Sequence, residues 1–180
     1  MCHYAVFGDS YISRLKYFTH GKLEISKPHM FFGVPGMATN RKFEGMFESL
    51  KTYKPRYVFI NLGGNDITDS CNPHDIYLNI INIVEELYNC GVERVFVASI
   101  VERGNFPKWT GLNHKLFNVY RRSVNKKLKK YFARDFVQIG KRLIYPRHND
   151  LDLVHPGNRQ GGMKIFKHEV LKAFKKTEHC

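Results

Sequence analysis

The chain has 180 residues, 43% of them hydrophobic and 14% aromatic, which is enough for a folded core and excludes a mainly disordered protein. Its mean hydropathy is −0.40, and no apolar run approaches the roughly 20 residues of a membrane-spanning helix. The net charge of +13 comes entirely from the second half, because residues 1–90 carry nine basic and nine acidic residues and residues 91–180 carry 20 and seven. This asymmetry is typical of a protein with an anionic partner.

We expect one domain over residues 1–180, since the length fits a single domain and no linker or repeat interrupts it. The first dozen residues lack the basic and apolar regions of a signal peptide, which predicts a cytoplasmic protein. The four cysteines form no CxxC pair, which argues against a disulfide framework and a cysteine zinc site; they are Cys2, Cys71, Cys90 and Cys180. No pattern indicates an oligomeric state.

Hydrophobic periodicity predicts strands and helices that alternate along the chain. The first half shows a strand at 3–8, a helix around 11–18, one or two strands within 22–34, a helix around 43–50 and a strand at 56–62. The second half shows a helix from 73, capped by Asn72 and ended by Gly91, a strand within 92–101, a helix around 112–128, a strand at 136–139 and a helix around 163–174. Residues 102–111 are expected to form a mobile surface loop.

Five strands that alternate with five helices predict an α/β fold, with a mostly parallel sheet covered on both faces. In such open sheets, ligands bind beyond the carboxyl ends of the strands. Candidate functional residues are therefore sought directly after each expected strand.

Three strand ends carry small or polar residues with two interpretations each. Ser10 of Gly8-Asp9-Ser10 is either the N-cap of the first helix or a nucleophile at a positive helix end. Gly36 stands in a Pro-Gly turn and is either a plain turn residue or an N–H donor to an oxyanion. Asn65 follows two glycines and is either part of a turn or a side-chain donor.

Asp152 and His155 follow the fifth expected strand, three residues apart. A histidine that shuttles a proton needs a carboxylate to fix its tautomer, and this spacing lets the two meet on one turn. Because the chain has nine histidines, the Asp152/His155 pair indicates catalysis only together with the residues at the other strand ends. Because the serine, glycine, asparagine and Asp/His pair each follow a different strand, they are expected at one sheet edge, where they supply nucleophile, oxyanion donors, base and orienter.

With these blocks in this order, the sequence resembles the SGNH (GDSL-type) hydrolase family. The resemblance spans residues 8 to 156 and rests on Gly8-Asp9-Ser10, Gly36, Gly63-Gly64-Asn65-Asp66 and Asp152-Leu-Val-His155-Pro156. It implies a three-layer α/β/α, flavodoxin-like sandwich with strand order 2-1-3-4-5. Two positions depart from the family pattern, since Pro35 stands where a small polar residue is common and Leu153 where glycine is common.

The resemblance also implies hydrolysis of small carboxylic esters by Ser10, His155 and Asp152. Ser10 N–H, Gly36 N–H and the Asn65 amide would form the oxyanion hole, and neither a metal nor an organic cofactor is required. The acyl and alcohol parts of the ester are left open. Trp109 and Phe106, from the loop at 102–111, are candidates to line one side of the site.

The competing hypothesis is a catalytically weak or inactive module of the same fold that binds nucleic acid or anionic lipid. Residues 115–134 contain eight basic residues and no acidic one. On a helix, four of them share a face, namely Arg122, Lys126, Lys129 and Lys130. This face is either a solvated helix surface or a contact for phosphates. No zinc finger, RRM or KH motif is present.

Overall fold

The computed structural model describes residues 3–41 and 43–178, so Cys2 and Cys180 lie outside it. The strands are β1 (Tyr4–Gly8), β2 (His29–Gly33), β3 (Tyr57–Asn61), β4 (Arg94–Ala98) and β5 (Phe136–Val137). The α-helices are α1 (Ser10–Phe18), α2 (Glu44–Tyr53), α3 (Pro73–Asn89), α4 (His114–Phe132) and α5 (Gly162–Lys175). None of the helices within the described ranges combines the length and apolar character needed to cross a bilayer.

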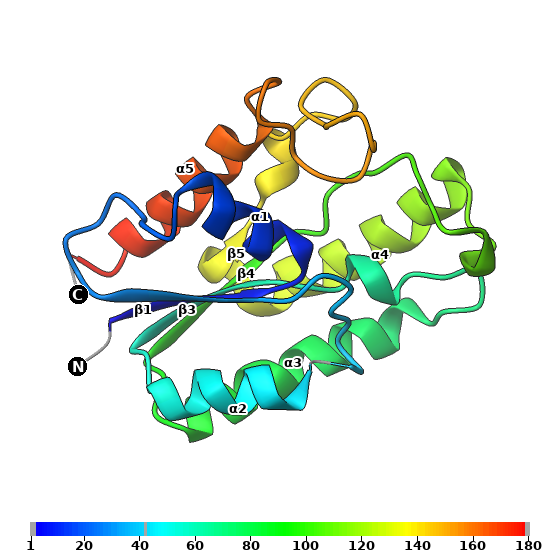
Figure 1. Ribbon diagram of the computed structural model, residues 1–180. Coiled ribbons are helices and arrows are strands. Elements are labelled where there is room, and N and C mark those ends of the chain that lie inside the picture. Colours follow the sequence, from blue (N-terminus) through cyan, green and yellow to red (C-terminus); the bar gives the residue numbers. More distant parts are fainter. Residues whose placement is uncertain (1–2, 42, 179–180) are drawn as a thin grey trace.

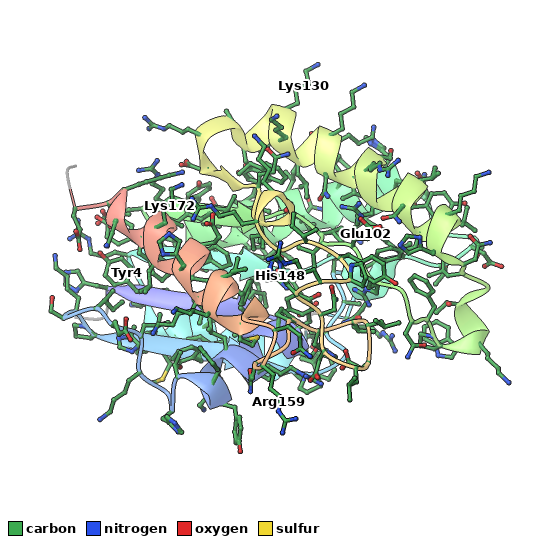
Figure 2. The ribbon with its side chains drawn as sticks, turned by 90° about the horizontal axis from the view of Figure 1, so that it is seen from above. Tyr4, Glu102, Lys130, His148, Arg159 and Lys172 are labelled. Carbon is green, nitrogen blue, oxygen red and sulfur yellow. The ribbon has the colours of Figure 1, made fainter. Side chains whose placement is uncertain are left out.

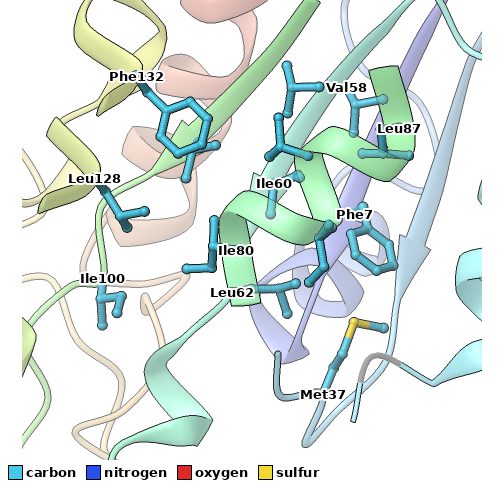
Figure 3. Close-up of a cluster of buried hydrophobic side chains, with 14 of the residues drawn as sticks. Phe7, Met37, Val58, Ile60, Leu62, Ile80, Leu87, Ile100, Leu128 and Phe132 are labelled. Carbon is cyan, nitrogen blue, oxygen red and sulfur yellow. The ribbon is translucent and has the colours of Figure 1, made fainter. Parts of the chain in front are cut away.

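The five strands form one parallel sheet in the order β2-β1-β3-β4-β5, which confirms the predicted topology. Helices α1 and α5 cover one face, and α2, α3 and α4 cover the other (Figure 1). Side chains alternate between the faces of each strand, so the core has two halves. In β1, for example, Phe7 packs under α2 while Val6 packs under α1 and α5. Figure 3 shows the half that contains Phe7, Met37 and Leu87.

At the two sheet edges, the range 22–34 contains one strand, β2, and the strand predicted at 136–139 is shorter than expected. Residues 22–28 form no strand, since the Leu23 N–H donates to the His29 ring at 2.9 Å instead of to a neighbouring strand. β5 has only two residues that pair with β4, and Ile139 begins the short helix η4 (Ile139–Lys141). Helix α3 follows its predicted signals, because the Asn72 side chain accepts from His74 N–H and Gly91 takes φ +93° after its end. Cys71 and Cys90 are free thiols.

The interpretation of Ser10 as the N-cap of α1 is wrong, because Asp9 takes that role. One Asp9 carboxylate oxygen accepts from Tyr11 N–H at 3.0 Å and from the Asn61 side-chain amide at 3.2 Å. Asp9 is 3% exposed, and this burial raises its pKa to about 6 even though the hydrogen bonds oppose the shift. Since Asp9 caps the helix, the Ser10 hydroxyl remains free for another partner.

We expect Asp9→Asn to stabilise the protein above about pH 6, because it keeps the capping oxygen and removes a buried charge. The pKa of the wild-type Asp9 carboxyl is higher in the folded state than in the unfolded state. The free energy of unfolding of the wild type therefore falls as the pH rises from about 4 to about 6. The rise in the pKa of Asp9 from 3.8 to about 6 lowers the free energy of unfolding of the wild type by at most roughly 3 kcal/mol near pH 8. Urea unfolding near pH 4 and pH 8 measures the difference, and a variant no more stable than wild type near pH 8 contradicts this account.

Candidate active site

Ser10, His155 and Asp152 form a continuous hydrogen-bonded chain. Ser10 Oγ lies 2.7 Å from His155 Nε2, and His155 Nδ1 lies 2.6 Å from Asp152 Oδ2. A carboxylate only accepts hydrogen bonds, so the neutral imidazole carries its proton on Nδ1 and Nε2 accepts from the Ser10 hydroxyl. The structure thus brings together the serine, histidine and aspartate that the sequence singled out.

Hydrogen bonds inside the turn hold Asp152 and His155 in place. The second Asp152 oxygen accepts from Val154 N–H and His155 N–H, both at 2.9 Å. Tyr11 Oη–H donates to the Val154 carbonyl at 2.6 Å and so ties this turn to α1. Leu153 takes φ +56°, a left-handed conformation that glycine adopts without strain. That backbone explains why leucine is an unusual residue at this position of the turn.

The surroundings of Asp152 and His155 lower the pKa values of both groups, for different reasons. Burial alone would raise the pKa of Asp152, but hydrogen bonds from His155 and Val154 outweigh it and hold the value at about 2. Burial lowers the pKa of His155 below its usual value, and the nearby charges of Arg14 and Arg103 add to this, while Asp152 opposes it. At neutral pH the aspartate is therefore ionised and the histidine is neutral, the states that a general base and its orienter need.

Arg14 joins this site although sequence reasoning missed it. Its guanidinium donates to Asp152 Oδ2 at 3.0 Å and to Asp150 at 3.3 Å. Arg14 lies four residues after Ser10 on α1, so the two side chains share one helix face. This spacing of four residues in the sequence could have indicated that Arg14 lies near the site.

Three N–H groups that the sequence proposed as oxyanion donors are free of acceptors within the described residues. Ser10 N–H is at the first position of α1, where no intrahelical acceptor exists. Gly36 has φ +79°, and its N–H donates to no described group. Asn65, in the short helix η1 (Gly64–Asp66), donates one amide N–H to the Met37 carbonyl at 3.0 Å and keeps a second.

The loops after β2 and β3 are fastened to each other by Asp66. Its carboxylate accepts from Thr39 N–H at 2.8 Å and from the Thr39 hydroxyl at 2.5 Å. Burial raises the pKa of Asp66 and the Thr39 hydrogen bonds oppose the shift. Because Asp66 adjoins Asn65 and Thr39 lies three residues after Gly36, this contact sets the spacing of two donor candidates.

A cavity of about 240 Å³ opens beside these two donors. Gly36 and Asn65 line it together with Phe106, Trp109 and Phe117, whereas Ser10 is not among its lining residues. Trp109 is 72% exposed and forms part of the outer wall. The expected mobile loop at 102–111 is partly ordered, since it contains the short helix η2 (Lys108–Thr110) and Phe106 packs on Phe117 at 5.1 Å between ring centroids.

Arg103 is the second residue that sequence reasoning missed. It lines the same cavity, and its guanidinium donates to Asn65 Oδ1 at 3.4 Å and lies 5.0 Å from the centre of the Phe117 ring. Gly64 makes this approach feasible, because a Cβ there would lie 1.9 Å from the Arg103 Nη2 atom. Arg103 follows β4, the one strand end at which the sequence indicated no candidate polar residue.

Residues 6–159 match the sequence profile of the GDSL-like Lipase/Acylhydrolase family. The chain belongs to this family. It is therefore a hydrolase, as the sequence resemblance predicted.

Solved structures agree on the fold. A GDSL-like lipase from Bacteroides thetaiotaomicron is 19% identical with a TM-score of 0.77, and the match covers 97% of this chain and 88% of that one. A lipase/acylhydrolase from Enterococcus faecalis is 16% identical with a TM-score of 0.74, covering 98% and 97%. A catalytic mutant of the acetylxylan esterase Axe2 from Geobacillus stearothermophilus is 14% identical with a TM-score of 0.64, covering 96% and 95%. A search of curated proteins returned no match.

We expect two substitutions to move the pKa of His155 in opposite directions. Asp152→Asn removes the charge that favours the imidazolium and lowers the pKa further, whereas Arg103→Gln removes a repelling cation and raises it. Titration of the His155 ring by NMR measures both shifts without any assay of activity. Shifts of the same sign in the two variants contradict the proposed electrostatic environment.

Proposed function

We propose that this protein hydrolyses small carboxylic esters through an acyl-enzyme on Ser10. The observation that carries the proposal is the chain from Ser10 Oγ through His155 to Asp152, with separations of 2.7 and 2.6 Å. Family membership supports the reaction class, and a hydroxyl, an imidazole and a carboxylate in contact suit the roles of nucleophile, base and orienter. No observation at this site favours the alternative of a catalytically inactive binding module.

In the first step, Ser10 Oγ attacks the carbonyl carbon while His155 Nε2 takes the hydroxyl proton. The carbonyl oxygen becomes an oxyanion that accepts from the N–H groups of Ser10 and Gly36 and from the free Asn65 amide hydrogen. The C–O bond to the alcohol then breaks, and His155 returns the proton to the departing oxygen. Asp152 stabilises the imidazolium between these events.

In the second step, a water molecule attacks the acyl group on Ser10 and gives its proton to His155. Collapse of the intermediate breaks the acyl–serine bond, and His155 reprotonates Ser10 Oγ as the carboxylic acid leaves. Arg103 is a positioning residue in this scheme, because its contact with Asn65 Oδ1 turns the amide nitrogen away from the guanidinium.

The size and lining of the cavity favour short acyl groups. Its volume of about 240 Å³ lies below the roughly 300–1,000 Å³ of typical ligand pockets. Aromatic and aliphatic side chains form much of its wall, including Phe106, Trp109 and Leu112. A short acyl chain fits this space next to Gly36 and Asn65, whereas a long one extends past Trp109 into solvent.

The direct test is a series of p-nitrophenyl esters of increasing chain length, with Ser10→Ala as the variant. We expect turnover to be highest for short chains and Ser10→Ala to abolish both turnover and labelling by a fluorophosphonate probe, because no other serine contacts His155 in the described chain. Ser13→Ala, on the same helix, is the matched control and should keep full labelling. Labelling that survives in Ser10→Ala refutes the assignment of the nucleophile.

Asn65→Ala tests the oxyanion donor. Removing one such donor costs about 2.7–4 kcal/mol of transition-state stabilisation, so kcat should fall by about 10²–10³ while KM changes little. Steady-state kinetics on the best ester separates the two parameters. A change confined to KM identifies Asn65 as a residue that binds the ground state instead.

A further inference from the structure

A cavity larger than the one beside Asn65 lies elsewhere in the described chain. It has a volume of about 460 Å³ and lies between α4, β5 and the segment from η4 to Tyr145. Its lining includes none of Ser10, Asp152 and His155. Whatever it binds therefore binds separately from the proposed esterase site.

Unpaired cations converge on this cavity. Arg122, Lys126 and Lys129 line it from one face of α4, and Lys141 lines it from η4. Within the described residues, none of these four side chains forms an ion pair with a carboxylate. Lys130, which the sequence grouped with them, does not line the cavity and projects outward from α4 (Figure 2).

The one acidic residue in the lining is already neutralised. Glu102 accepts from the Arg121 guanidinium at 3.4 Å, and its carboxylate lies 2.8 Å from His114 Nε2. Arg121 also donates to the Asn118 side chain and to the Ile100 carbonyl, so it is a fixed part of the wall. The positive charge of the other four side chains consequently faces the cavity without an internal partner.

A second cavity extends this basic surface toward α5. It has a volume of about 240 Å³ and shares Phe136, Gln138 and Lys141 with the larger one. Lys172 of α5 lines it, across the segment that follows β5 (Figure 2). Glu169 also lines the second cavity and pairs with Arg142 at 3.7 Å, whereas Lys172 forms no ion pair within the described residues. We call the two cavities together the basic groove, defined by the cations Arg122, Lys126, Lys129, Lys141 and Lys172.

We propose that the basic groove binds the phosphodiester backbone of single-stranded nucleic acid. Cations that line a continuous concave path match a flexible linear polyanion, which releases counterions as each phosphate is neutralised. Arg122 and Lys129 are seven residues apart on α4, which separates them by about 10 Å along the helix axis. Tyr145 adds an aromatic side chain to the wall of the larger cavity, where a base can contact it.

A bilayer fits the same charges less well. Its surface is flat, whereas these cations line concave cavities. Proteins that lie on a membrane insert exposed apolar side chains between the headgroups. Among the exposed large hydrophobic residues of the described chain, Ile144 is the one that lines the basic groove.

The test measures binding of a fluorescein-labelled 20-residue oligothymidylate by anisotropy at several salt concentrations. With one phosphate contact for each of the five cations, the plot of log K against log salt should have a slope of about −3.5. The double variant Lys126→Glu/Lys129→Glu should lose at least about tenfold in affinity at low salt and reduce the slope to about −2. Lys16→Glu/Lys27→Glu changes the net charge equally at exposed lysines outside both cavities, and should lose less than about twofold.

Hydrolysis of a short p-nitrophenyl ester by both double variants reports that the fold is intact, so failure of this proposal and failure of the proposed function are distinguishable. Equal losses in the two double variants would show attraction by net charge alone and overturn the proposal. Tighter binding to duplex DNA, to vesicles containing phosphatidylserine, or to inorganic phosphate than to the oligothymidylate also overturns it. Each of these probes is measured in the same salt series.

Discussion

The close approach of α1 to the ends of three parallel strands is the constraint on which the site depends. A Cβ on Gly8 would lie 2.1 Å from the Asn61 carbonyl oxygen, and one on Gly33 would lie 2.6 Å from Ser13 N. Gly8 pairs with both Gly33 and Asn61, so β1, β2 and β3 end at the same level. Only glycine lets the chain turn from β1 into α1 at this contact, and the turn sets Ser10 at the edge where the other loops arrive.

Buried polar contacts then hold the separate loops at that edge. Asp9 links the start of α1 to Asn61, and Asp66 links the loop after β3 to Thr39 in the loop after β2. Tyr11 fastens the Asp152–His155 turn to α1. The first two contacts use carboxylates, and burial raises the pKa values of both Asp9 and Asp66. The fold thus accepts an electrostatic cost to fix the positions of groups that come from distant parts of the sequence.

The sequence predicted the order of elements because strand and helix periods are strong and the caps of α3 are explicit. It also predicted Ser10, Asp152 and His155, since each follows a strand and three residues suffice for the Asp/His contact. It did not predict Arg14 and Arg103, because their contacts depend on how α1 and the loop after β4 pack in space. The role of Asp9 as the cap was missed because Ser10 was an equally good capping residue type. Likewise, the basic face of α4 was visible in the sequence, but the groove required the positions of η4 and α5.

We propose that the N–H groups of Ser10 and Gly36 and the Asn65 amide converge on the oxyanion of the tetrahedral intermediate, which forms when Ser10 Oγ attacks the ester carbonyl. A crystal structure of the adduct with a short alkyl fluorophosphonate tests this most directly, because its phosphoryl oxygen occupies the oxyanion position. We predict a covalent bond to Ser10 Oγ and that oxygen within about 2.7–3.1 Å of Ser10 N, Gly36 N and Asn65 Nδ2. An adduct on another residue, or a phosphoryl oxygen that points into solvent away from Gly36 and Asn65, would contradict the account.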